Sequence, residues 1–226
     1  MNSTRRSWIV LFLLLSLGAI AITSATIRLL AMNDASLHGI PANDETGLQH
    51  YLDYSVISLM HLIPGSLFLL LGPFQFNKRF RQRAPALHRN FGKIFIVAGL
   101  MVGFSALSMA ILFPVIVNSF STIGNALFGT SLILCLLLAY RFVRQDNIAA
   151  HRQWMIRAYV IGLTPASMRV FILPLFVILG EDKIMPIMPA LIWFSFSVQI
   201  LIGEFIIRRS PKPRPGVSQT ANTANA

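Results

Sequence analysis

Only 12% of the 226 residues are charged, against about 25% in soluble domains, which excludes a large soluble domain and favours one membrane domain. The formal net charge of +11 therefore indicates membrane orientation and contact with anionic lipid at the cytoplasmic face, and we expect no nucleic-acid partner. The single cysteine, Cys135, lies in an apolar run, which excludes disulfides and cysteine-based zinc or iron–sulfur sites.

Six segments are long and apolar enough to cross the hydrocarbon core as helices, which takes about 20 residues each. They cover residues 8–30, 55–76, 94–117, 124–143, 154–179 and 186–207. They predict an all-α membrane helix bundle over residues 1–209. The polar segment 31–54 is predicted to be an extramembrane loop that caps one face, and residues 210–226 a disordered cytoplasmic tail.

The first apolar run has two interpretations. Arg5 and Arg6 before an apolar stretch, with Ser24-Ala25 after it, is the pattern of a cleaved signal peptide, and the pair of arginines faintly resembles a twin-arginine signal. The apolar run continues to Leu30, however, and is longer than the core of a usual signal peptide. We therefore expect an uncleaved first helix.

Basic residues gather at alternate ends of the six spans. They precede the first span, flank the second-to-third and fourth-to-fifth connections, and follow the sixth span. Most of the acidic residues lie at the opposite ends, in segment 31–54 and at Glu181 and Asp182. Because short loops rich in Lys and Arg stay in the cytoplasm, both termini are predicted to be cytoplasmic.

The second-to-third and fourth-to-fifth connections share a pattern. Arg81-Gln82 precedes His88-Arg89 at the same spacing as Arg144-Gln145 precedes His151-Arg152. The membrane topology explains the basic residues of this pattern but not its Gln and His. A match as short as this one can also arise by chance. The pattern predicts a parallel repeat of spans two and three with spans four and five, related by a pseudo-twofold axis along the membrane normal.

In such a repeat His88 and His151 are equivalent residues at the cytoplasmic ends of two helices. Two imidazoles from facing helices are the usual axial ligands of a haem b, and Arg89 and Arg152 would then pair with its propionates. The alternative is that both His-Arg pairs bind lipid phosphate at the headgroup level.

Two ionisable residues inside the spans share a depth, and such groups usually face the bundle interior. His61 lies about 9 Å from the outer surface and Arg169 about 8 Å, at 1.5 Å of helix rise per residue. Pro165 and Pro174 flank Arg169, so we expect an interrupted fifth helix around a ligand-binding site for a quinone or small anion. The alternatives are that Arg169 extends outward to headgroups and that His61 bonds a neighbouring carbonyl.

A second charged pair is predicted near the cytoplasmic surface. Glu204 in the sixth span lies about 5 Å deep, level with Arg157 in the fifth. We expect a structural ion pair between them, or one between Glu204 and Lys93.

Two blocks of polar, Gly and Pro residues lie in the middle of the chain. The first runs from His61-Leu62-Ile63-Pro64-Gly65 through Gly72-Pro73-Phe74-Gln75-Phe76 to Leu87-His88-Arg89-Asn90-Phe91-Gly92-Lys93, and the second is His151-Arg152-Gln153-Trp154-Met155-Ile156-Arg157 with the later Arg169. Together they resemble the bacterial "domain of unknown function 2306" family of predicted membrane proteins, over about residues 55–180. This resemblance implies a multi-pass protein of the bacterial cytoplasmic (inner) membrane, and no established activity.

A looser likeness is to cytochrome b561-type bundles, in which histidines on four helices hold two haems. His88 and His151 match one such pair, but His61 has no partner, because Gly124 and Asn125 occupy its repeat-related positions. A two-haem electron carrier is therefore not expected.

Three functions remain open. The first is a redox membrane protein that uses haem b or a quinone, and the second is a transporter for a small or proton-coupled solute. The third is a non-catalytic membrane or assembly factor. No hydrolase or phosphate-loop motif is present in the sequence.

Overall fold

The computed structural model describes residues 3–40, 47–113 and 119–209, and this part of the chain is all-helical. Its elements are α1 (Ser3–His38), α2 (Leu48–Asp53), α3 (Ser55–Phe76), α4 (Lys78–Arg83), α5 (Pro85–Leu112), α6 (Ser119–Arg144), α7 (Ile148–Leu179), α8 (Glu181–Ile184), the 3₁₀ turn η1 (Met185–Ile187) and α9 (Met188–Arg208). Six of these, α1, α3, α5, α6, α7 and α9, are long and apolar enough to cross a membrane, which confirms the predicted spanning helices. The predicted tail over residues 210–226 lies outside the described residues.

Several helices extend beyond the predicted spans. α5 begins at Pro85 instead of residue 94, and α7 begins at Ile148 instead of residue 154. Pro85 occupies the first turn of α5, where its missing N–H is not needed. The Asn147 side chain caps α7 by accepting a hydrogen bond from the Ala150 N–H at 3.0 Å. Hydropathy therefore marked the apolar part of each helix and not its ends, because polar residues can continue a helix outside the hydrocarbon core.

The predicted loop over residues 31–54 is wrong for much of its length. α1 continues to His38, because neither Gly nor Pro occurs in residues 31–38, and Gly39, whose positive φ of 86° lies in the region that ends helices, follows. α2 then follows, and its Leu48 packs against Met32 and Ala35 of α1. The segment thus covers one end of the bundle mainly as helix.

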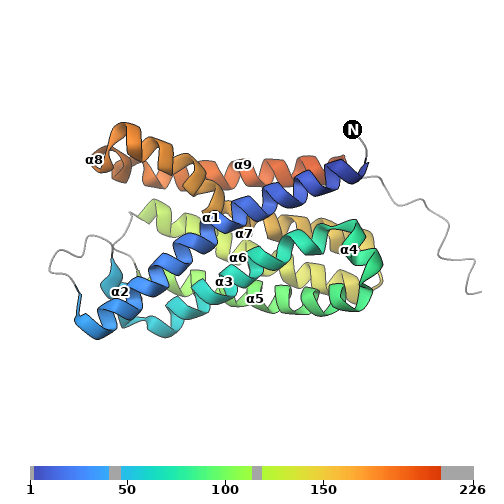
Figure 1. Ribbon diagram of the computed structural model, residues 1–226, viewed down its shortest axis with the longest axis horizontal. Helices are drawn as coiled ribbons and strands as arrows, with labels where there is room; N and C mark the ends of the chain where they lie inside the picture. The colour runs from blue at the N-terminus through green and yellow to red at the C-terminus, as the bar shows by residue number, and fades with distance from the viewer. Residues whose placement is uncertain (1–2, 41–46, 114–118, 210–226) are drawn as a thin grey trace, which may run out of the picture.

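The spanning helices are arranged around two antiparallel hairpins. α3 and α5, joined by α4, form one hairpin, α6 and α7 form the other, and α5 packs against α6. α1 lies on α3 and α7, and α9 lies on α7 and α6. Figure 1 shows α4, the α6–α7 turn and both described chain ends at one end of the bundle, here named the α4 end, and α2 and α8 at the other, the α2 end.

An aromatic cluster fills the centre where the hairpins meet. The rings of Phe68 and Phe95 stack with centroids 4.1 Å apart, and Tyr159 lies against both. Gly99 and Gly162 face this cluster, and a Cβ atom at either position would overlap the Phe68 ring. Small residues at such positions let membrane helices approach closely, so these glycines set the spacing of α3, α5 and α7.

Candidate functional site

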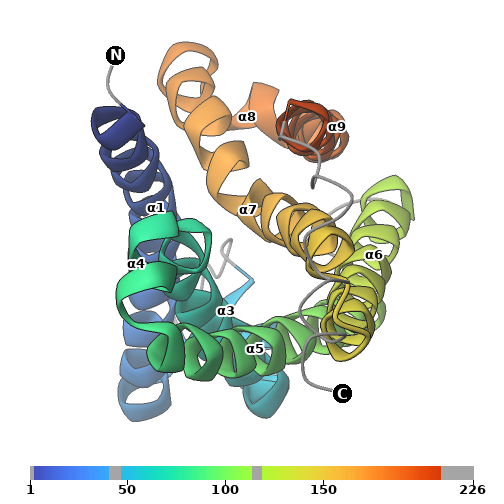
Figure 2. The same ribbon diagram turned by 90° about the vertical axis from the view of Figure 1, so that its right-hand side faces the viewer.

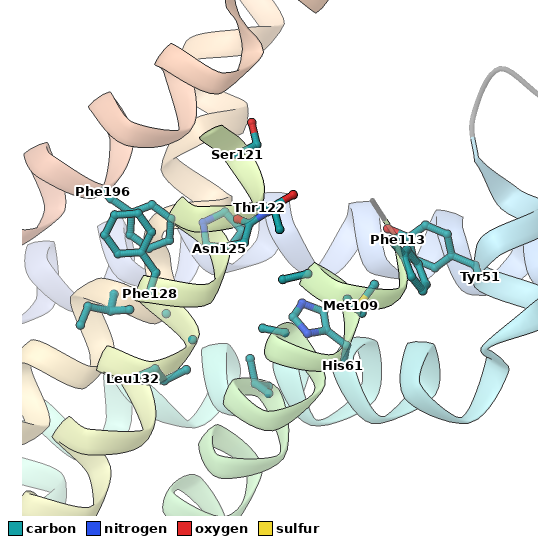
Figure 3. Close-up of a pocket in the computed structure, with 17 residues that line it drawn as sticks. Tyr51, His61, Met109, Phe113, Ser121, Thr122, Asn125, Phe128, Leu132 and Phe196 are labelled. Carbon is teal, nitrogen blue, oxygen red and sulfur yellow. The ribbon is translucent and has the colours of Figure 1, made fainter. Parts of the chain in front are cut away.

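Two adjoining cavities lie in the half of the bundle toward the α2 end. The first, named the α6 cavity, has a volume of about 290 Å³ and is walled mainly by α5, α6 and α7 (Figure 3). The second, named the α1 cavity, has a volume of about 460 Å³ and is walled by α1, α3, α5 and α7. The lining residues that the two cavities share are Tyr51, His61, Val102, Met109, Gly162 and Pro165.

His61 lies at the junction of the two cavities and is oriented by a hydrogen-bonded serine. Its Nδ1 is 3.1 Å from Ser105 Oγ, and that hydroxyl donates its own hydrogen to the carbonyl oxygen of Val102 at 3.0 Å. A hydroxyl has one hydrogen to donate, so Ser105 accepts from Nδ1–H of His61. In the neutral ring Nε2 then carries a lone pair and acts as an acceptor.

Polar groups of α6 lie across the cavity from this ring. Figure 3 shows the imidazole of His61 pointing into the cavity, with Asn125 and Thr122 on the facing helix. The remaining surface is mostly apolar, with Met109, Phe128 and Leu132 among its lining residues. The α6 cavity thus combines an apolar wall with an acceptor on α3 and amide and hydroxyl groups on α6, the pattern of a small-molecule site.

Arg169 lines the α1 cavity together with His61, so the two residues that share a depth in the sequence also share a cavity. Its Nε donates to Ser24 Oγ at 2.8 Å and its Nη1 to the carbonyl oxygen of Pro165 at 2.8 Å. Ser24 donates its own hydrogen to the carbonyl oxygen of Ile20, which leaves its oxygen as the acceptor for the guanidinium. The arginine therefore connects α7 to α1 through neutral groups.

The expectation of an interrupted helix around Arg169 is wrong. α7 continues through both Pro165 and Pro174 without a break. Each proline removes one backbone hydrogen bond, and the bonds on either side are enough to hold the helix, which bends instead. In Figure 2 the orange C-terminal part of α7 leans away from its yellow N-terminal part.

Arg157 and Glu204 form a two-point ion pair between α7 and α9. Arg157 Nε donates to Glu204 Oε1 at 2.6 Å and Nη2 donates to Oε2 at 3.2 Å. The side chains are 27% and 34% exposed, and the guanidinium also lies over the Trp154 ring, 4.6 Å from its centroid. This pair has the geometry of a structural connection and lies apart from the residues that line either cavity.

His88 and His151 both lie at the α4 end, in the first turns of α5 and α7. His151 donates from Nδ1 to the carbonyl oxygen of Ala139 at 2.8 Å, so its Nε2 carries the lone pair in the neutral ring. Among the described residues, the buried Nδ1 of His88 has no hydrogen-bond partner.

The haem between these histidines stays a prediction. A haem needs an apolar slot between its axial ligands, and neither cavity described above is lined by His88 or His151. Arg89 and Arg152 are exposed side chains. The donor atom of His151 suits a haem ligand, but these two cavities do not suit a haem at this pair, and we derive no chemistry through one.

Residues 58–207 match the family model described as predicted membrane protein (DUF2306). The chain belongs to this family. Neither the curated proteins nor the solved structures give a significant match to the chain.

The DUF2306 match includes both hairpins and α9 but not α1 or α2. His61, Ser105, Asn125 and Arg169 thus lie inside the matched segment, whereas the α1 wall of the larger cavity lies outside it. The sequence pattern marked Ser24 only as part of a possible signal-peptide cleavage site, and it did not mark Arg28 or Tyr51. A charged residue late in an apolar run was an available signal for Arg28, but no sequence signal places Tyr51 of α2 against the core.

Proposed function

We propose that this membrane protein binds a quinone-class lipid in the α6 cavity, with His61 contacting an oxygen of the head group. The observation that carries the proposal is the Ser105–His61 hydrogen bond, which fixes the imidazole with Nε2 as acceptor at the junction of the cavities. A reduced head group has hydroxyls that donate to this nitrogen. An oxidised head group has carbonyl oxygens, which accept from the amide of Asn125 or the hydroxyl of Thr122.

The proposed parallel repeat supports this location. Gly99 follows His88 at the same spacing as Gly162 follows His151, and both glycines lie against Phe68. The same spacing relates His61 of α3 to Gly124 of α6, and Asn125, the residue after it, lines one cavity with His61. The ligand would therefore sit on the pseudo-twofold axis between the two hairpins, where the two halves of a repeat usually build their site.

The proposed topology has the α4 end in the cytoplasm of a bacterial inner membrane. Its support is the charge of that end, which includes Arg81, Arg144 and Arg208 and would contact anionic lipid. We expect a phosphatase inserted after Gly39 to be active. We also expect a green fluorescent protein fused to the C-terminus to fluoresce. A phosphatase that is active when fused after Arg209 would contradict this orientation.

Binding of a quinone analogue to the detergent-purified protein tests the proposed function. The His61→Ala variant should bind about fivefold to thirtyfold more weakly, because it loses one hydrogen bond in an apolar site. His38→Ala is the matched control, since His38 is an exposed side chain at the α2 end. Equal binding by His61→Ala and the wild type, or no binding by the wild type, would overturn the proposal.

Transport of a small solute is a second candidate, favoured by the bend of α7. Pro165 lines both cavities, so straightening the helix there would change the connection between them. Flux of a solute into proteoliposomes that falls in Pro165→Ala, while analogue binding is kept, would support transport. If neither small anions nor proton-coupled solutes are transported, transport is contradicted and only the binding function remains.

A further inference from the structure

Arg169 is a cation in a spanning helix whose hydrogen-bond partners are all neutral. It contacts a serine hydroxyl and a backbone carbonyl, and among the described residues no carboxylate pairs with it. An arginine keeps its charge in proteins, and an uncompensated charge inside a membrane protein is costly. Arg157, which pairs with Glu204, shows how the same fold neutralises such a charge.

Arg169 does not extend toward the nearer membrane surface, which lies on the side of Leu179, the nearer end of α7. The guanidinium instead folds back along the helix to the Pro165 carbonyl and across to Ser24 of α1. Both residues line the α1 cavity, so the charge is directed into that cavity and away from the headgroup layer nearest to it.

The rest of the α1 cavity suits an anion attached to an apolar chain. A second arginine, Arg28, lines it and lies over the ring of Tyr51, 4.5 Å from the centroid. The described residues that line it include two arginines and no Asp or Glu, while Phe68 and Leu62 are among its apolar members. The hydroxyl of Ser66 is a further polar group on its α3 wall.

We propose that the α1 cavity binds a phosphate-class anion, carried by the head group of a membrane lipid, with Arg169 as its counter-ion. Ser24 positions the guanidinium by accepting from Nε, which leaves Nη2 and the second hydrogen of Nη1 available for the anion. This site does not rest on a quinone in the α6 cavity, although an occupant of either cavity meets His61.

Binding of lipid to the delipidated protein in a neutral detergent tests the site. Phosphatidylglycerol should bind and raise the Tm of the wild type, and phosphatidylcholine, which has no net charge, should have a much smaller effect. Arg169→Gln should weaken phosphatidylglycerol binding about tenfold or more, because the charge-assisted hydrogen bonds are lost. Arg169→Lys keeps the charge and should retain part of the binding.

The controls separate this site from general attraction to a basic surface. Lys183→Gln removes an exposed charge from α8 at the α2 end and should leave the lipid affinity unchanged. Inorganic phosphate added alone distinguishes the source of the anion: stabilisation of the wild type but not of Arg169→Gln would support the site with free phosphate as its occupant. Equal lipid affinity in the wild type and Arg169→Gln, or no effect of any of the three additives, would overturn the proposal.

If Arg169→Gln does not fold, two other variants supply the same comparison. These are Arg169→Lys and Ser24→Ala, and Ser24→Ala should weaken binding about threefold.

Discussion

Ser105 of α5 holds the imidazole of His61 of α3 by accepting from its Nδ1 while donating to its own backbone at Val102. The contact joins the two helices of one hairpin and fixes one tautomer of the histidine. It converts a flexible ring into an acceptor with a defined direction. The proposed contact between His61 and a head-group oxygen requires positioning of this kind.

Ser105→Ala should therefore weaken quinone-analogue binding with little loss of stability. The lost hydrogen bond is worth about 1 kcal/mol, so we expect binding about fivefold weaker and a folded protein. Ser108→Ala is the matched control, because the Ser108 hydroxyl bonds only its own helix at Phe104 among the contacts described for it. Equal binding by the two variants, measured by titration of the analogue, would show that Ser105 does not position His61.

Removing one member of the Arg157–Glu204 pair should destabilise the junction of α7 with α9. The pair makes two charge-assisted hydrogen bonds but is partly exposed, so we expect Glu204→Gln to lower the free energy of unfolding by about 1–2 kcal/mol. Thermal unfolding in detergent measures this. A double variant, Arg157→Met with Glu204→Met, should recover much of the loss, because no unpaired charge is left. Additive losses in the double variant would mean that the two residues do not interact.

Depth along the helix axis could be predicted from the sequence, because 1.5 Å of rise per residue converts numbering into height. That arithmetic placed Arg157 level with Glu204 and His61 level with Arg169, and the first two form an ion pair while the last two line one cavity. It could not predict which helices are neighbours or which way a side chain turns around the axis. The Ser105–His61 hydrogen bond depends on both of these properties.

The ends of the bundle were also beyond prediction from hydropathy. α1 continues to His38 because a helix ends where backbone geometry changes, at Gly39, and not where the apolar residues stop. The continuity of α7 through Pro165 and Pro174 has a related cause, since the surrounding backbone bonds outweigh the one that each proline removes. The glycine and the two prolines mark both positions in the sequence. Whether the helix ends or continues at each position depends on the surrounding backbone and packing, which hydropathy does not show.

Gly162→Ala should destabilise the bundle, because its Cβ would overlap the Phe68 ring that stacks on Phe95. Overpacking of this kind costs about 1–3 kcal/mol, and Phe68→Leu in the same chain should restore part of it. Gly65→Ala is the control, because its Cβ would lie 3.6 Å from Val102 Cγ2, an ordinary contact. Similar unfolding temperatures for Gly162→Ala and Gly65→Ala would contradict the packing described for the centre.

The optical spectrum of the purified protein tests the haem that the sequence suggested. The two cavities lie around His61 and not around His88 and His151, so we expect no Soret band in protein expressed with ample haem. His151→Ala should then act only through its bond to the Ala139 carbonyl, which joins the first turn of α7 to α6, and lower stability by about 1 kcal/mol. A Soret band that disappears in both His88→Ala and His151→Ala, but not in His38→Ala, would instead establish a haem at the α4 end. Binding of a quinone analogue at His61 is measured without any haem signal, so it is independent of the optical spectrum. A redox protein that holds both a quinone and a haem would give analogue binding and a Soret band.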